Sequence, residues 1–480
     1  MTKIVLDLKK EKTEPFNHYW KRSVGSCHAH IGLRADWQQQ LKQVHTELGF
    51  QYIRFHGLLD DDMGIYQENR NGEVDCNFNR VDKLFDYILE IGMKPFVEFG
   101  FMPKKLATGE KTVFWFKSNV TPPKDYGKWA ALIEQLVRHW KDRYGLKEIR
   151  SWFYEVWNEP DHPAFFSGTK EDYFKLYQYT VKAVKTVDLE LRVGGPAGAA
   201  NIYLADFVEF CAAFNIPVDF LSLHCYCCDL KYVDETVKTW TTLPAQHAYE
   251  YIQKNIVLEK ASKIPNLKFH YTEWNITPSS RDQVHDTLLN GAFNLEIIKM
   301  VYGLVESFSF WTFSDIFEEA GVPQSEFHGG FGLLTESGIK KPTYHSFWLL
   351  NQLGNKRFET RSAPLLMTKK PDGSLQVLGW NYKSANESSD SLQITVEFLN
   401  LKKKRYKLTR YLVNEKKSNA LFFHQQMGAP RFPDWKQRST LKEKSEIYST
   451  IQKTKSLSSL SFNFHLAPNT IEMITIEQAV

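Results

Sequence analysis

The sequence contains few cysteines and no long hydrophobic run. Six cysteines in 480 residues are too few for a disulfide-stapled scaffold, which favours a reducing compartment. No stretch of about 18 uncharged apolar residues occurs, so we expect no transmembrane helix. Residues 1–12 are charged and have no apolar core of the kind that a secretory signal peptide requires. Together these absences predict a cytoplasmic protein with no membrane partner.

The chain also lacks a strong excess of either charge. Its 60 basic and 56 acidic residues give a net charge of +4. A protein dedicated to nucleic-acid binding would cluster its basic residues on one face. The one dense basic block, Lys402-Lys403-Lys404-Arg405, is short and typical of a solvated strand edge or turn. We therefore expect no nucleic-acid partner.

Strong metal-binding motifs are missing as well. Cys225, Cys227 and Cys228 lie close together, but zinc sites usually combine a C-x-x-C pair with a second ligand pair, which the sequence lacks. The favoured interpretation is small buried residues at the end of an apolar strand. The acidic run at residues 60–62 is typical of a solvated turn. The sequence thus predicts no metal and no organic cofactor.

Between about residues 23 and 347, eight β-rich runs alternate with amphipathic helices. The runs are largely apolar, as expected for parallel strands buried on both faces, and a helix follows nearly every one. This pattern predicts an α/β fold, specifically a (β/α)8 barrel. An open doubly wound sheet would place a glycine-rich loop after its first strand, where Gly25 stands alone. The predicted strands cover residues 24–27, 52–56, 95–99, 152–157, 192–195, 220–224, 269–274 and 308–313.

The sequence changes character after about residue 350, where helical periodicity fades. Alternating β-type segments at residues 375–378, 392–398 and 470–476 are separated by turn residues. They predict an accessory β-sandwich, and we expect the strand-like residues 4–8 to pair with it. The predicted domains are a catalytic barrel over residues 15–350 and a sandwich over 351–480 that takes in residues 1–14.

Two glutamates fall at the ends of predicted strands. In Asn158-Glu159-Pro160 the proline cannot continue a central strand because it has no N–H donor. Glu159 is therefore left at the strand's carboxyl end, the edge where barrel enzymes place catalytic groups. Glu273 ends the seventh run, within Tyr271-Thr272-Glu273-Trp274-Asn275. Strands four and seven face each other across an eight-stranded barrel, so the two carboxyls can converge.

Two convergent carboxyls suit the cleavage of a glycosidic bond. One protonates the leaving oxygen, and the other is either a nucleophile or a base that activates water. A gap of about 5–5.5 Å permits direct attack with retention, whereas about 6.5–9.5 Å gives inversion. Asn158 could hydrogen-bond the sugar 2-hydroxyl, and Tyr226 could hold a nucleophilic carboxylate ionised. The other polar residues at predicted strand ends are His56, His224, Glu318 and Glu319.

Several motifs resemble those of glycoside hydrolase family 39, especially its bacterial β-xylosidases. They include Trp157-Asn158-Glu159-Pro160, His224-Cys225-Tyr226, Thr272-Glu273-Trp274-Asn275 and the run from Trp311 to Glu319. The resemblance extends along the whole chain and implies a retaining mechanism, with Glu159 as acid/base and Glu273 as nucleophile. It also implies a sugar-binding set, made up of Asn158, His56, His224, Tyr226, Trp311, Glu318 and Glu319.

The resemblance further implies release of β-D-xylose from the non-reducing end of xylo-oligosaccharides or aryl xylosides, by a homo-oligomer that is a dimer or tetramer. Residues 225–228 and 276–280 flank the expected pocket, and their sequence differs from the one more common in the family. An α-L-iduronide, a β-glucoside or an arabinoside therefore stays open as the substrate. A transglycosylase and a non-catalytic carbohydrate-binding protein are the remaining alternatives.

Overall fold

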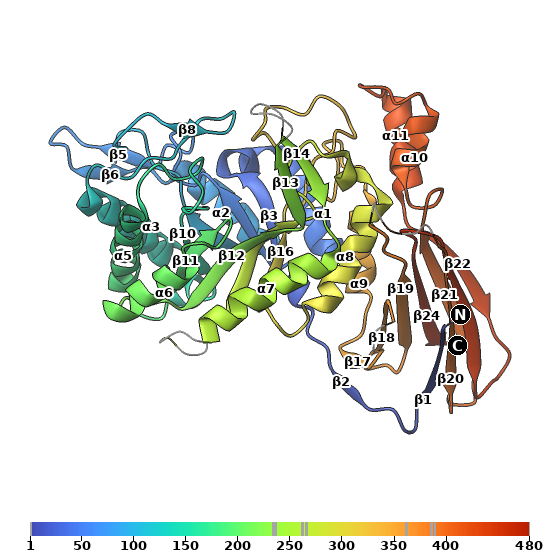
Figure 1. Ribbon diagram of the computed structural model, residues 1–480. Coiled ribbons are helices and arrows are strands. Elements are labelled where there is room, and N and C mark those ends of the chain that lie inside the picture. Colours follow the sequence, from blue (N-terminus) through green and yellow to red (C-terminus); the bar gives the residue numbers. More distant parts are fainter. Residues whose placement is uncertain are drawn as a thin grey trace.

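The computed structural model describes residues 2–232, 238–260, 264, 267–360, 363–384, 387 and 390–479. Eight parallel strands close into a barrel in chain order (Figure 1), and each contains or overlaps one predicted run. The predicted (β/α)8 barrel is therefore confirmed. The barrel strands are β3 (Ser23–His28), β4 (Tyr52–His56), β7 (Lys94–Phe99), β10 (Phe153–Val156), β11 (Arg192–Gly198), β12 (Phe220–Tyr226), β15 (Phe269–Asn275) and β16 (Ser307–Phe310).

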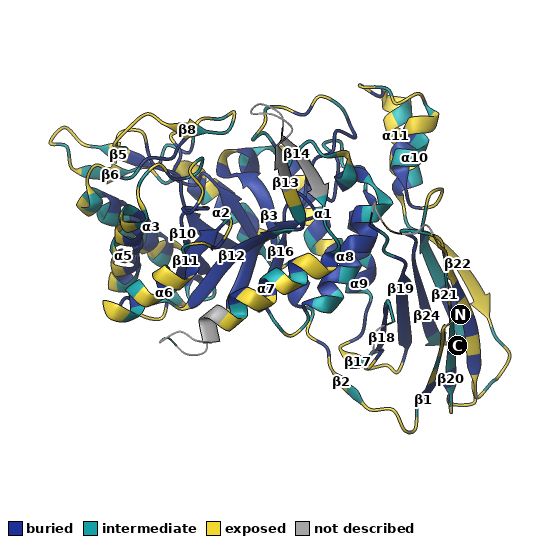
Figure 2. Ribbon diagram, viewed as in Figure 1, coloured by how far each residue is buried: buried dark blue, intermediate teal, exposed yellow. Residues whose placement is uncertain are grey.

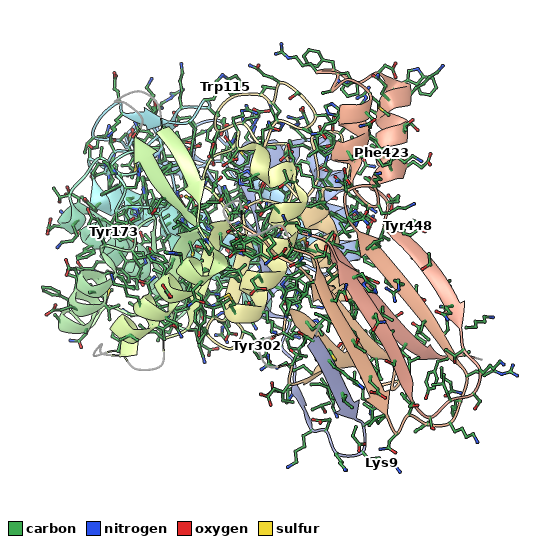
Figure 3. All side chains as sticks on the ribbon, turned by 45° about the vertical axis from the view of Figure 1, so that its right-hand side comes forward. Lys9, Trp115, Tyr173, Tyr302, Phe423 and Tyr448 are labelled. Atoms are coloured by element: carbon green, nitrogen blue, oxygen red, sulfur yellow. The ribbon has the colours of Figure 1, made fainter. Side chains whose placement is uncertain are left out.

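One main helix follows each barrel strand and covers the outside of the barrel. The apolar stripe of the first helix, Trp37, Leu41 and Val44, is fully buried, and the helix ends where Gly49 takes a left-handed φ of +79°. Figure 2 shows the same division elsewhere, with buried strands inside and exposed helix faces outside. The eight helices are α1 (Ala35–Leu48), α2 (Asn79–Glu90), α3 (Tyr126–Tyr144), α5 (Lys170–Val187), α6 (Leu204–Ala213), α7 (Ala245–Lys260), α8 (Leu288–Met300) and α9 (Pro342–Asn351).

Short elements occupy the connections. Helix α4 (Leu146–Ile149) and the 3-10 turns η1 (Tyr19–Lys21), η2 (Ala29–Leu33) and η3 (Gln283–Asp286) join longer elements. None of the described helices combines the length and apolar character needed to cross a membrane. Three two-stranded hairpins follow barrel strands: β5 (Tyr66–Glu68) with β6 (Val74–Cys76), β8 (Thr112–Val113) with β9 (Ser118–Asn119), and β13 (Cys228–Tyr232) with β14 (Lys238–Thr242).

The C-terminal strands form two sheets that share one apolar core. Strand β1 (Thr2–Asp7) pairs in parallel with β20 (Leu392–Leu399), and β2 (Thr13–Pro15) pairs antiparallel with β17 (Lys356–Phe358). The expected pairing of the N-terminal strand with the sandwich is thus confirmed, while the domain limits at residues 14 and 350 stay predictions. The remaining strands are β18 (Leu365–Lys369), β19 (Leu375–Trp380), β21 (Tyr406–Val413), β22 (Tyr448–Lys453), β23 (Leu460–Leu466) and β24 (Ile471–Gln478).

Two helices within the C-terminal region were not predicted. Helices α10 (Ala420–Gln426) and α11 (Trp435–Ser445) lie between β21 and β22 and project beyond the sheets (Figure 1). Helix α11 buries only Leu441 and Ser445, so it has almost no apolar periodicity from which to recognise a helix. Leu441 packs with Phe327 and Ile339 of the β16–α9 loop, which attaches the helical pair to the barrel.

Candidate active site

A cavity of about 790 Å³ opens among the carboxyl ends of the barrel strands. This is the face on which barrel enzymes place their active sites. Of the nine residues predicted for the site, seven line the cavity, and the exceptions are His224 and Glu318. The seven are His56, Asn158, Glu159, Tyr226, Glu273, Trp311 and Glu319.

The backbone after β10 turns sharply to present Glu159. Trp157 and Glu159 take left-handed φ values of 71° and 47°, a conformation that is uncommon for residues with a side chain and is concentrated at functional sites. The Trp157 amide donates to Phe99 O at 3.1 Å, and the Glu159 amide donates to Ala197 O at 2.9 Å. The two neighbouring strands therefore hold the turn from both sides.

His224 supports Glu159 from below the cavity. Its Nδ1 lies 2.8 Å from Glu159 Oε1 and 3.6 Å from Glu273 Oε2. Burial, assisted by the nearby Arg54 cation, lowers the pKa of His224 well below its ordinary value. The ring is consequently neutral and fixes the Glu159 carboxyl by hydrogen bonding rather than by charge.

Both oxygens of Glu273 are held by donors. Arg54 Nη1 donates to Oε1 at 2.8 Å, and the Tyr226 hydroxyl donates to Oε2 at 2.8 Å. Burial, the largest cause, raises the pKa of Glu273 above its ordinary value, and the Arg54 cation and the Tyr226 hydrogen bond oppose this rise. These contacts favour the ionised form, as a nucleophilic carboxylate requires.

The two glutamates lie close enough to act on one bond. An oxygen of Glu159, an oxygen of Glu273 and a nitrogen of His224 all lie within 4.8 Å of one another. This separation matches the short gap of retaining enzymes, about 5–5.5 Å, rather than the wide gap of inverting ones. Burial, followed by repulsion from Glu273, raises the pKa of Glu159 well above its usual value. The proton therefore resides on Glu159 and the negative charge on Glu273.

Beneath the pair lies a buried charge network that sequence reasoning missed. The fully buried Arg54 contacts Glu98 at 2.8 Å and Glu155 at 2.5 Å as well as Glu273. Its Nη2 also donates to Asn158 Oδ1 at 2.9 Å, which orients the amide. The available signal was a charged residue within three of the apolar strand runs, namely Arg54, Glu98 and Glu155.

His56 lies between this network and the cavity. Its Nδ1 is 2.7 Å from Glu98 Oε2, and its Nε2 is 3.5 Å from Glu273 Oε1. The ring of Trp311 lies 4.8 Å from the imidazole, measured between centroids. Burial lowers the pKa of His56 to about 3, so the ring is a neutral hydrogen-bonding group at the cavity wall.

The structure separates the adjacent residues Glu318 and Glu319. Glu319 lines the cavity, with Oε1 3.7 Å from His56 Nε2, and burial raises its pKa well above the ordinary value. Glu318 instead accepts a hydrogen bond from Arg34 Nη1 at 3.0 Å and does not line the cavity. Of the two, Glu319 alone is placed to contact a sugar.

Within the described part of the chain, Glu159, His224 and Glu273 are the only three acidic, histidine or cysteine residues grouped closely enough to hold a metal ion. Hydrogen bonds from Arg54 and Tyr226 already occupy Glu273, so the group is accounted for without an ion.

The Cys227 thiol donates to Leu243 O and Pro244 O, both at 3.3 Å. Cys227 and the half-buried Cys228 both line the cavity, in agreement with the expectation that residues 225–228 flank the pocket.

A carboxyl pair with this separation, at the open end of a (β/α)8 barrel, defines a glycoside hydrolase. The chain belongs to glycosyl hydrolases family 39, whose sequence model matches residues 2–458. It is 39% identical to a β-xylosidase of Geobacillus stearothermophilus across 99% of this chain and 95% of that protein. It is 47% identical to a β-xylosidase of Caldicellulosiruptor saccharolyticus across 72% of this chain and 70% of that protein.

A solved structure agrees along the whole chain. The crystal structure of a monomeric β-xylosidase from Caulobacter crescentus CB15 superimposes with a TM-score of 0.95 at 31% identity, covering 100% of both chains. The barrel and the sandwich therefore share one arrangement in the two proteins.

Proposed function

We propose that this chain is a retaining β-xylosidase that releases β-D-xylose from the non-reducing end of xylo-oligosaccharides. The observation that carries the proposal is the pair of buried carboxyls, Glu159 and Glu273, with oxygens within 4.8 Å of each other. The relatives described above support xylose as the sugar, because they are named β-xylosidases.

The reaction follows from where the proton lies. Glu273 attacks the anomeric carbon while Glu159 gives its proton to the leaving oxygen, so a glycosyl ester of Glu273 forms. Esterification removes the negative charge of Glu273, one of the causes that raise the pKa of Glu159. Glu159 then acts as the base that takes a proton from the attacking water. His224 stays neutral in both steps, so it can hydrogen-bond Glu159 when that residue acts as an acid and when it acts as a base.

A neutral sugar fits this cavity better than a uronide. No lysine or arginine is found among the described residues that line it, whereas carboxylate recognition normally uses a cation. The charged residues that line the cavity, Glu159, Glu273 and Glu319, are acidic and offer a uronide carboxylate no counter-ion. A panel of nitrophenyl glycosides tests this point: we expect the β-xyloside to have the highest kcat/KM. A higher value for the iduronide would overturn the choice of sugar.

The Glu273→Gly variant tests the role of the nucleophile. We expect turnover to fall by about 10⁴-fold or more, and added azide to restore it with an α-xylosyl azide as product, because azide enters the space left by the carboxylate. A control variant, Glu318→Gly, removes a carboxylate that does not line the cavity. Hydrolysis by Glu273→Gly at the wild-type rate would exclude Glu273 as nucleophile.

Assembly and location are part of the same proposal. We propose a dimer or tetramer, supported by the exposed aromatic residues Phe432 (74% exposed) and Trp435 (70% exposed) near the start of α11. Light scattering measures the mass of the assembly, and a single 56 kDa species would overturn the proposed oligomer.

We also propose a cytoplasmic location, supported by six cysteines that are all free thiols. Cell fractionation tests this location.

A further inference from the structure

The cavity has two chemically different halves. One half contains Glu273, Asn158, His56 and Glu319, whose polar atoms can meet sugar hydroxyls, with the indole of Trp311 beside them. The other half is formed by the segments after β10, β11 and β12. Much of its surface is carbon, contributed by Phe165, Ala199, Ala200, Leu243 and Ala248.

Several polar groups of this second half, here called the apolar wall, are hydrogen-bonded within the protein. Asp161 accepts hydrogen bonds from three backbone amides of the loop after β11, those of Ala199 at 2.7 Å, Ala200 at 3.2 Å and Ile202 at 3.2 Å. The carboxylate is thereby satisfied by backbone. The loop it holds presents the methyl groups of Ala199 and Ala200 to the cavity.

Two further contacts complete the apolar wall. Asn201 Nδ2 donates to the Tyr251 hydroxyl oxygen at 2.6 Å, and the Cys227 thiol donates to the backbone carbonyls of residues 243 and 244. The wall therefore uses much of its hydrogen-bonding capacity internally. His162, His247 and Cys228 are the other polar side chains among its described residues.

Glu159 marks the border between the halves. Its carbonyl accepts from the His162 amide at 3.0 Å, and its amide donates to Ala197 O at 2.9 Å, so the segments that form the apolar wall are attached directly to it. An acid that protonates the leaving oxygen must lie between the reacting sugar and the leaving group. The leaving group consequently lies against the apolar wall.

We propose that this side of the cavity accepts an apolar alcohol, such as an aryl or alicyclic aglycone, in preference to a second xylose. The inference rests on the proposed function and specifies its substrate class. An aromatic wall can cover one face of a sugar ring, but the hydroxyls around that ring lose hydrogen bonds to water and find few partners among the described residues of this wall. An apolar ring has no such loss and gains from burial.

The apolar wall should also influence the second step of the reaction, in which the glycosyl ester of Glu273 is cleaved. An alcohol bound there attacks the glycosyl ester: its oxygen forms a bond to C1, the bond from C1 to Glu273 breaks, and the alcohol proton passes to Glu159. Benzyl alcohol should therefore intercept the intermediate more efficiently than added xylose does, with benzyl β-D-xyloside as product.

The decisive comparison is kcat/KM for benzyl β-D-xyloside against xylobiose. Both place the same sugar in the polar half, and benzyl alcohol is the weaker acid, so leaving-group chemistry alone favours xylobiose. We expect benzyl β-D-xyloside to be preferred by about tenfold, the scale of discrimination by an apolar pocket. An equal or higher value for xylobiose would overturn this inference alone, whereas hydrolysis of neither compound would overturn the proposed function.

A matched pair of variants locates the effect. Ala200→Asn puts an amide on the apolar wall, and Ala213→Asn makes the same change at an exposed position at the end of α6, outside the cavity. We expect Ala200→Asn to reduce the preference for the benzyl compound by about threefold or more, mainly through KM. The control should leave it unchanged. An unaltered preference in Ala200→Asn would show that the apolar wall does not select the leaving group.

Discussion

Two adjacent layers inside the barrel use the same strands for opposite purposes. The lower layer is aromatic: Phe96 stacks on Phe153 at 5.0 Å between centroids, and both contact Phe220. Two residues further along β7 and β10 lie Glu98 and Glu155, paired in register across the strands. Successive inward-facing positions on a strand are two residues apart. From one layer to the next, the interior of the barrel thus changes from packed aromatic rings to the charged groups of the site.

The difference shows where stability and reactivity are placed. Aromatic packing in the lower layer buries large apolar surfaces in preferred geometries and stabilises the fold. The upper layer buries three carboxyl groups around one guanidinium, burial raises the pKa of Glu98 to about 8, and Glu98 Oε1 has no hydrogen-bond partner. Desolvation of such charges opposes folding, but it also produces the shifted pKa values on which proton transfer depends.

The variant Arg54→Met should have the largest effect, because it leaves three buried carboxyls without a cation. We expect the free energy of unfolding to fall by about 3–5 kcal/mol and kcat to fall on the order of 10²-fold. Urea unfolding and steady-state kinetics measure the two effects. Arg54→Lys, which keeps the charge but loses the fork geometry, is the control and should recover part of the stability. A stable and active Arg54→Met variant would show that neither folding nor catalysis depends on this cation.

Phe153→Leu should weaken the lower layer alone. The ring stacks on Phe96 and lies 4.7 Å from the imidazole of His270, measured between centroids, so its loss should cost about 1–2 kcal/mol of unfolding free energy. The values of kcat and KM at low temperature should not change. Differential scanning calorimetry with parallel kinetics tests this, and a specific loss of kcat in fully folded protein would contradict the separation of roles.

Glu155→Gln should give the reverse result in the upper layer. The amide keeps the shape of the side chain and its contact with Thr272, which donates to Glu155 Oε1 at 2.8 Å, but removes a charge beside Arg54. We expect kcat to fall by about tenfold, with the unfolding free energy within about 1 kcal/mol of wild type. Comparison with Phe153→Leu under identical conditions provides the control. Unchanged kinetics would mean that this carboxyl is purely structural.

The pH profile should distinguish the two glutamates of the proposed mechanism. Activity requires Glu273 ionised and Glu159 protonated, so kcat/KM should rise with pH as Glu273 loses its proton and fall at higher pH as Glu159 does. Burial and Glu273 raise the pKa of Glu159, so we expect the alkaline limb well above the ordinary range of a carboxyl. A dinitrophenyl xyloside needs no protonation on leaving and should lose that limb. Persistence of the limb with this substrate would assign it to another group.

Glu318→Gln should have the smallest effect. Its partner Arg34 is 38% exposed, and such ion pairs contribute about 0–1 kcal/mol, so kcat/KM should stay within about twofold of wild type. Glu319→Gln is the matched comparison and should raise KM, because that side chain lines the cavity. Similar losses in both variants would contradict the separation of the two residues.

The sequence was sufficient to predict the barrel, because buried parallel strands appear in it as apolar runs and amphipathic helices appear as apolar residues at helical spacing. It was also sufficient to place Glu159 and Glu273 at one cavity, since strand ends can be recognised from breakers such as Pro160. Arg54 and Glu98 could not be recognised in the same way, because a charge within a strand is informative only once the register shows which side faces inward. The apolar wall depends on loops that are distant in sequence, and no local pattern predicts their meeting.

The pairing of β1 with β20 has a consequence for biosynthesis. The first strand leaves the ribosome several hundred residues before its partner, and β2 likewise precedes β17. The barrel segments emerge between them and can pack while the sandwich still lacks its C-terminal strands. Until β17 and β20 have emerged, the leading strands have exposed edges, a condition that invites pairing with other chains. Shielding of this leading segment, by its many charges or by a chaperone, is therefore expected to raise the yield of folded protein.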